Sequence, residues 1–388
     1  MIRSIPLTLR KTNTQKRQEK EAASPVAGSN CTNKEACALR DISVQLPGML
    51  LLVLPSIAFT NKAETNAPAV LHAADDNTVI VPKIMHIPKT GVDSLCQELK
   101  TQGTWANPEQ VHCAGVWEGS PVRESCLGAM PAGEFTLTYV RSPREHVISE
   151  YSQCRFGERD GLDGFHVPGY DGSDGDDFSE AYFRKWLEHT AEHTDSYGCY
   201  HPANMQGRYL TCSRPMAEAH FLPSEAEREP DLSAALGALA RLDFVGVVEL
   251  YDESWCALQH ALRGKLPADC TCDKIGVPAR KTRTHAATHV TPWHSGEVHE
   301  EHGVKPHPSG DELSDVAKQL VDGATAIDRQ VYTHATARFV GELCALQRTS
   351  GKQLLCDGQM QKLRDATRYI TSLWPAVKQA AQGCTLPS

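Results

Sequence analysis

The feature that most constrains this chain is a predicted strand, tight turn and helix packed into residues 79–101. Residues 79–87 (VIVPKIMHI) are mostly β-branched or apolar, which predicts a buried strand. The turn Pro88-Lys89-Thr90-Gly91 follows, and residues 93–101 then carry apolar side chains at helical spacing. Such a turn directs backbone N–H groups and the positive end of a helix at whatever lies above it. The stretch therefore predicts an anion-binding site.

A second stretch, residues 135–154, repeats this order. The strand predicted at 135–140 leads into the turn Arg141-Ser142-Pro143, and a helix is predicted at 144–154. Arg141 offers a fixed fork for a phosphate, and Ser149, about two helical turns later, adds a hydroxyl donor. Ligands of open α/β sheets bind at the carboxyl ends of strands. The two stretches together predict one ligand that carries two separated phosphate-like groups.

The rest of the chain alternates a short apolar stretch with helical patterns. A further strand is predicted at 243–249. Further helices are predicted at 178–193, 203–211, 231–241, 251–263, 311–321 and 325–347. Strands separated by helices favour an α/β fold, with a central parallel sheet flanked by helices.

The N-terminal part predicts a membrane anchor. Residues 42–61 carry no charged side chain, and about 20 apolar residues span a bilayer. Basic residues lie mainly before this segment, so the positive-inside rule places the N-terminus in the cytosol and the body in the lumen. A cleaved signal peptide or another targeting leader is the alternative. The expected organisation is a disordered cytosolic tail (1–41), a transmembrane signal anchor (42–61), a stem (62–77) and a body domain (78–388).

Cysteine and charge usage indicate the compartment and the class of partner. Of 14 cysteines, twelve follow residue 61, an even number that fits disulfide bonds in an oxidising lumen. Their pairing cannot be deduced from the sequence. No Cys-x-x-Cys pair and no other metal-ligand spacing occurs, so no metal is expected. After residue 60 the chain carries 31 basic and 44 acidic residues, which disfavours a nucleic-acid partner.

The two phosphate-binding stretches form a recognisable combination. "HIPKTG" followed by "VRSPREHVISEY", with Lys89 and Arg141 52 residues apart, resembles the membrane-bound carbohydrate sulfotransferases, in particular the heparan sulfate 2-O- and 6-O-sulfotransferases. "HPANMQGRYLTC" (201–212) and "LDFVGVVELYDESWCAL" (242–258) resemble further elements of sulfotransferase-domain proteins. The likeness covers residues 79–346 in the same order. It implies a P-loop-like sulfotransferase fold whose co-substrate is 3′-phosphoadenosine 5′-phosphosulfate.

The resemblance also implies roles for single residues. Lys89 would neutralise the bridging oxygen as the sulfonate leaves. The residues expected to hold the two phosphate groups of the donor are Thr90, Gly91 and Ser94 for the 5′-phosphate, and Arg141 and Ser149 for the 3′-phosphate. In several sulfotransferases a late basic loop meets the 3′-phosphate or an anionic acceptor. Arg280, in "ARKTRTHAATH" (279–289), is therefore a further candidate, and a solvated basic loop is the alternative.

Transfer to a hydroxyl also requires a general base near the acceptor oxygen. Related enzymes use a His or Glu, often between the two phosphate motifs, so the candidates are His112, Glu118 and Glu124. Glu124, in "RESC", is most similar to a Glu-x-Cys pattern of related sequences. For each of the three candidates, the alternative is an ordinary solvated position in a loop.

One position departs from the family. Asp93 stands where Ser or Thr is common, after Val92 in place of Gly. A carboxylate here would lie beside the donor's dianion unless it turns away. We expect Asp93 to cap the following helix by accepting a backbone N–H from Cys96 or Gln97.

The sequence thus predicts a single-pass type II protein of the Golgi membrane with a lumenal sulfotransferase domain at 78–388. Its expected activity is transfer of a sulfonate group to a glycan or another hydroxyl-bearing acceptor. One alternative is a catalytically inactive protein of the same fold that binds a glycan or another partner. Another is a nucleotide-dependent kinase, although no Gly-x-x-x-x-Gly-Lys-Ser/Thr motif is present.

Overall fold

The computed structural model describes residues 82–92, 135–156, 178–197, 200–211, 224–275 and 307–384, with Leu95, Leu99 and Val167. All of them belong to one compact unit, residues 65–388. The predicted tail, anchor and stem lie outside the described residues. Within the described part, no helix is long and apolar enough to cross a membrane.

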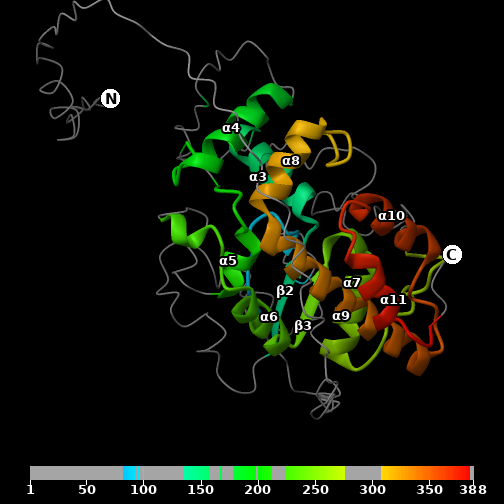
Figure 1. The fold of residues 1–388 in the computed structure, drawn as a ribbon. Coiled ribbons are helices and arrows are strands. Elements are labelled where there is room, and N and C mark those ends of the chain that lie inside the picture. Colours follow the sequence, from blue (N-terminus) through cyan, green and yellow to red (C-terminus); the bar gives the residue numbers. More distant parts are fainter. Residues whose placement is uncertain are drawn as a thin grey trace, which may run out of the picture. The chain divides into compact units, whose positions relative to one another are not determined.

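The described part of the chain contains a parallel sheet of three strands in the order β1–β2–β3. Figure 1 shows β2 and β3 side by side. The strands are β1 (Lys83–Ile84), β2 (Thr136–Val140) and β3 (Phe244–Val247). Lys83 of β1 stands opposite Thr136, and β2 pairs with β3 from Leu137 opposite Phe244 to Val140 opposite Val247. A mixed α/β architecture with a parallel sheet agrees with the prediction from the sequence.

Helices connect the strands and follow them. Their bounds are α3 (Pro143–Phe156), α4 (Glu180–Glu192), α5 (Met205–Thr211), α6 (Leu232–Arg241), α7 (Tyr251–Arg263), α8 (Asp315–Ala324), α9 (Ala326–Ser350), α10 (Asp357–Thr367) and α11 (Leu373–Ala380), with 3₁₀ turns η4 (Glu225–Glu227) and η5 (Val248–Leu250). Val92, Leu95 and Leu99 are also helical, which agrees with the helix predicted after the first turn. Each predicted helix from 144–154 to 325–347 has a counterpart in the structure.

Two strand predictions were too long. The ladder of β1 covers Lys83–Ile84 and continues only through the amide of Met85, which donates to the Leu137 carbonyl at 2.8 Å. Pro82 has no N–H to contribute. At the other strand, residues 248–250 form η5 instead of the end of the predicted strand 243–249. The Ser254 hydroxyl binds the amide of Val247 at 2.9 Å and its carbonyl at 3.1 Å, which ends the strand there.

The sequence reasoning also missed α10 and α11. The helix α10 is short and mostly polar, and buries only Met360, Leu363 and Thr367. It packs against η5. A helix of this kind is stabilised by tertiary contacts more than by local propensity, which explains why its pattern gave little signal.

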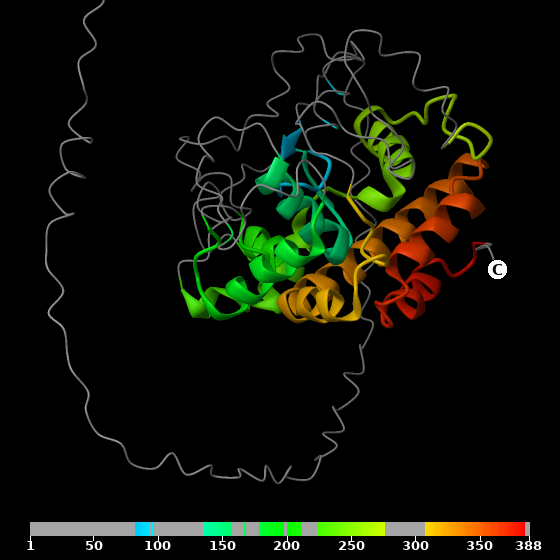
Figure 2. The ribbon, with the colours of Figure 1, turned by 90° about the horizontal axis from the view of Figure 1, so that it is seen from above.

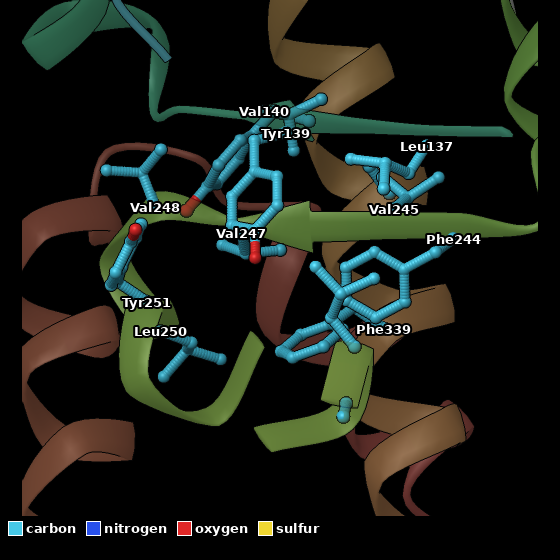
Figure 3. Packing of buried hydrophobic residues seen from close by; sticks show 14 of the residues in the cluster. Leu137, Tyr139, Val140, Phe244, Val245, Val247, Val248, Leu250, Tyr251 and Phe339 are labelled. Atoms are coloured by element: carbon cyan, nitrogen blue, oxygen red, sulfur yellow. The ribbon is translucent and has the colours of Figure 1, made fainter. Parts of the chain in front are cut away.

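The core is built around β2 and β3, whose residues are all buried, as expected for parallel strands covered on both faces. Tyr139 stands opposite Gly246, and a Cβ at Gly246 would lie only 2.5 Å from the Tyr139 ring. Glycine is therefore required there. Figure 3 shows Tyr139 beside Phe244 and Tyr251, with ring centroids 6.1 and 5.9 Å apart, and Phe339 of α9 next to Phe244.

The long helix α9 and three disulfide bonds organise the C-terminal part. α9 packs against β3, α5, α6, α7 and α11, and lies alongside α11 in both views (Figures 1 and 2). The bridges are Cys256–Cys270, Cys272–Cys356 and Cys344–Cys384, and Cys154 is also disulfide-bonded. The expectation of disulfide bonds is confirmed.

A second apolar cluster fixes the orientation of α3. Val147, Ile148 and Tyr151 pack with residues of α4 and α8. The Tyr151 ring meets Phe183 edge-on, with centroids 5.1 Å apart. Because this face of α3 is held by α4 and α8, its polar face is turned to the loop that follows β1.

Candidate functional site

The polar face of α3 contacts the loop of residues 88–91, which we call the first loop. His146 and Gln153, seven residues apart and therefore on one side of the helix, both reach it. The Nε2 atom of His146 lies 2.7 Å from the Pro88 carbonyl oxygen, and the Lys89 ammonium donates to Oε1 of Gln153 at 2.9 Å. These contacts join the two predicted phosphate-binding stretches into one site.

The first loop has an unusual backbone. Lys89 has a φ of 64° and Gly91 a φ of 74°. The left-handed region suits Gly91 but is rare for a residue with a side chain, and such conformations gather at functional sites. The buried Thr90 hydroxyl donates to the Ile87 carbonyl at 2.7 Å, so the side chain of Thr90 closes the turn.

In the described part of the chain, three carbonyls in or next to the first loop are bound, whereas the amides of Gly91 and Val92 are not. The Ile87, Pro88 and Lys89 carbonyls accept hydrogen bonds or contacts from Thr90, His146 and Arg141. Among the residues that the structure describes, nothing accepts a hydrogen bond from the amides of Gly91 and Val92. These two donors stand at the start of a helix, where the dipole adds a positive field, so the loop can bind an anion.

The turn of residues 141–143, which we call the second turn, has the opposite character. The amide of Arg141 donates to Gln206 Oε1 at 3.1 Å, and that of Ser142 to Glu249 Oε1 at 2.7 Å. The next available amide, that of Arg144, donates to the Tyr369 hydroxyl at 3.1 Å. The second turn therefore differs from the expected repeat of the first, since an anion there would be bound by side chains alone.

Of the two side chains predicted for the second phosphate, Ser149 lies on α3 and Arg141 precedes that helix by two residues. The Ser149 side chain is buried and makes no hydrogen bond within the described part of the chain. It stands one turn after His146, on the side of α3 that faces the first loop. Arg141 is 2% exposed, and its Nη1 atom donates to the Lys89 carbonyl at 3.3 Å. Burial lowers the pKa of Arg141, an effect opposed by Glu145 and Glu249.

A pocket of about 280 Å³ opens beside Arg141. Its walls come from the carboxyl ends of β2 and β3, from the segment around Ser309 and from α10, and they include Glu145, Glu249 and Lys362. Lys362 was not predicted as a site residue, because α10 itself was not predicted. The pocket adjoins the first loop through the Arg141 contact.

A buried network supports the second turn from α5 and α9. The Gln206 side chain binds both the amide and the carbonyl of Arg141, at 3.1 and 2.9 Å. Asp328 accepts the amides of Gln206 and Gly207 at 3.1 and 2.8 Å. Burial raises the pKa of Asp328 to about 7, although these two amides lower it.

Several residues of the candidate site were not predicted from the sequence, for different reasons. His146, Glu150 and Gln153 recur at helical spacing inside "PREHVISEYSQC", and their polar stripe could have been read as a face turned to the first loop. Gln206, Glu249 and Tyr369 carry no local signal, because their partners are distant in the sequence. The predicted candidates Ser94, His112, Glu118, Glu124 and Arg280, together with Asp93, lie outside the described residues.

Comparisons of the chain with protein-family models, with curated proteins and with solved structures give no match.

Proposed function

We propose that this protein transfers a sulfonate group from 3′-phosphoadenosine 5′-phosphosulfate to a hydroxyl-bearing acceptor, expected to be a carbohydrate, on a P-loop-like sulfotransferase fold. One observation carries the proposal. Among the described residues nothing accepts from the amides of Gly91 and Val92, which follow Lys89, and nothing bonds to the Ser149 hydroxyl, which α3 holds on the side that faces the first loop.

The residues present fit the two ends of the donor. The first loop offers backbone donors and a cation for the 5′-phosphosulfate. Ser149 offers a buried hydroxyl, and Arg141 a guanidinium, for the 3′-phosphate. When bound, the donor supplies the activated sulfonate. Lys89, oriented by Gln153, then stabilises the negative charge that develops on the leaving phosphate.

The reaction also requires a residue that accepts the proton of the acceptor hydroxyl. The bond between sulfur and the bridging phosphate oxygen breaks as the acceptor oxygen bonds to sulfur, and the hydroxyl proton passes to a general base. His112, Glu118 and Glu124 are the proposed candidates for this base. No oxidant or reductant is involved.

The proposal is tested by incubating the full-length protein with labelled donor and a panel of glycan, lipid, tyrosine and small hydroxyl acceptors. Transfer of label to one class is expected. Calorimetry with adenosine 3′,5′-bisphosphate then tests the site. A charge-assisted contact contributes about 1.5–3 kcal/mol, so Arg141→Ala should weaken binding roughly 10- to 150-fold. Lys89→Ala should mainly lower turnover.

A control removes a buried hydroxyl from the same helix. Ser152 is fully buried on α3 and its hydroxyl has no partner in the described part of the chain. Ser152→Ala should therefore leave nucleotide affinity within about twofold of wild type, whereas Ser149→Ala should reduce it several-fold. Normal turnover of both Lys89→Ala and Arg141→Ala would place the site elsewhere in the molecule.

A catalytically inactive protein of the same fold is the second candidate. It is favoured by the second turn, where Gln206, Glu249 and Tyr369 occupy the amides that would otherwise meet a phosphate. Such a protein would label no acceptor, and its affinity for adenosine 3′,5′-bisphosphate would be lost altogether. Binding of this nucleotide separates the two candidates.

A further inference from the structure

Two buried side chains of α3 form a pair beneath the first loop. His146 is 1% exposed and Glu150 is fully buried. The Nδ1 atom of His146 lies 3.0 Å from Oε1 of Glu150, while its Nε2 atom lies 2.7 Å from the Pro88 carbonyl oxygen. The imidazole thus bridges a carboxyl group and the backbone of the loop that carries Lys89.

The geometry identifies where the protons lie. A carbonyl oxygen can only accept, so Nε2 of His146 must carry a hydrogen. In the neutral imidazole, Nδ1 then presents a lone pair to Glu150. No donor in the described part of the chain hydrogen-bonds to either carboxyl oxygen of Glu150. A buried carboxylate without donors is strongly unfavourable, whereas a protonated carboxyl group can donate to Nδ1.

Electrostatics favour the same arrangement. Burial raises the pKa of Glu150 well above its ordinary value, and Asp328 reinforces this effect. Burial also lowers the pKa of His146 to about 3. The charged groups that face the pair are Asp328 on α9, Arg208 on α5, Arg141 at the end of β2 and Lys89 in the first loop. The three cations lower the pKa of both groups. Burial outweighs them at Glu150 and acts with them at His146, so a buried imidazolium–carboxylate pair is disfavoured.

We propose that Glu150 is a protonated acid that donates a hydrogen bond to Nδ1 of a neutral His146, and that this pair fixes the first loop through the Pro88 carbonyl. Both are positioning residues, since they act on Lys89 through the backbone. The loop requires such support because Lys89 is held in a left-handed conformation. The inference rests on the proposed function only where nucleotide affinity is the readout.

Nitrogen NMR of the full-length protein tests the protonation states directly. The expected signal of His146 is that of the neutral ring protonated at Nε2, unchanged between about pH 5 and 8. A ring that titrates near its ordinary pKa, or one protonated at Nδ1, would overturn the proposal. His146→Gln identifies the signal.

The variant Glu150→Gln tests the role of the acid, because an amide is isosteric with a protonated carboxyl group and can donate to Nδ1 in its place. The pKa of Glu150 is raised in the fold, so its contribution to stability is complete below the unfolded value and is lost as the pH rises through the folded value. The folded-to-unfolded ratio of wild type should fall by up to about tenfold per pH unit there, relative to Glu150→Gln.

Nucleotide affinity supplies the positioning readout. Glu150→Gln should bind adenosine 3′,5′-bisphosphate within about twofold of wild type, whereas Glu150→Ala should bind at least about tenfold more weakly. Ser152→Ala is the matched control on the same helix. If Glu150→Gln binds as weakly as Glu150→Ala, or if wild type and Glu150→Gln have the same pH dependence of stability, the proposal is wrong.

The spectroscopic and stability measurements need no nucleotide. A wild-type protein that binds none would contradict the proposed function, while the NMR and pH results would still decide between a neutral and an ionised pair. If Glu150→Ala does not fold, the comparison of wild type with Glu150→Gln and the NMR signal of His146 still test the proposal.

Discussion

The first loop and the second turn follow neighbouring parallel strands and are similar in sequence, yet different backbone groups are hydrogen-bonded in each. At the first loop, three carbonyls are bound, by Thr90, His146 and Arg141, and the amides of Gly91 and Val92 have no acceptor among the residues that the structure describes. In the second turn, side chains of Gln206, Glu249 and Tyr369 occupy the amides. Similar local sequence therefore gives one turn with open amides and one turn whose amides are occupied.

The difference lies in partners that come from far along the chain. The three side chains that close the second turn stand 65, 107 and 225 residues from the amides they accept. No local pattern encodes such contacts. A strand–turn–helix motif thus predicts the direction of the amides, whereas the rest of the fold determines whether those amides are available.

The largest expected effect concerns the disulfide bond before α10, the helix that leads to Tyr369 and so to the second turn. Cys272–Cys356 closes a loop with a sequence separation of 84 and precedes the helix that leads to Tyr369. Replacing both cysteines by serine should lower the free energy of unfolding by about 4 kcal/mol, measured by chemical denaturation. Hydrogen exchange should accelerate at the Arg144 amide more than at the Leu95 amide. Equal acceleration at both amides would mean that the bridge supports the first loop as much as the second turn.

The next effect comes from Glu249, which accepts the Ser142 amide and the Tyr332 hydroxyl at 2.7 and 2.8 Å. Glu249→Ala leaves two buried donors without a partner and should cost about 2–4 kcal/mol of unfolding free energy. The matched control is Glu312→Ala, which removes an exposed carboxylate that accepts the Ser309 amide, and should cost about 1 kcal/mol or less. Similar losses in the two variants would refute a special role for the closed second turn.

The smallest effect isolates the backbone of the first loop. Lys89→Gly and Lys89→Ala both remove the contact with Gln153, but only glycine adopts a φ of 64° without strain. Lys89→Gly should be the more stable of the two by about 1–2 kcal/mol in thermal or chemical unfolding. Gly351→Ala, at a φ of 69° in open space, calibrates the same penalty elsewhere. Equal stability of the two Lys89 variants would mean that the loop is not strained.

Most of the described strands and helices could be predicted from the local pattern of apolar residues. Short apolar stretches gave β2 and β3, and apolar spacing gave the helices from α3 to α9. The sequence failed where tertiary contacts decide the outcome, at the Ser254 hydroxyl that ends β3 and at α10, which depends on packing against η5. In the candidate site, the turn at Lys89, Thr90 and Gly91 was predictable because proline and glycine set it locally. The contact of Gln206 with Arg141 was not predictable, because it requires α5 to meet the second turn in space. His146 and Glu150 stand four residues apart on α3, but their burial depends on the elements packed around that helix.

The disulfide bonds have a consequence for limited proteolysis. Cys344 lies between Cys272 and Cys356 in the sequence, and its partner Cys384 lies beyond them, so two of the bridges interleave. A single cut anywhere between Cys272 and Cys344 falls inside the ring closed by Cys272–Cys356. The two fragments would stay covalently joined, and the segment that carries Tyr369 would stay tethered to α7. A molecule nicked there would migrate as one chain on a denaturing gel until a reductant is added, and only then separate into two.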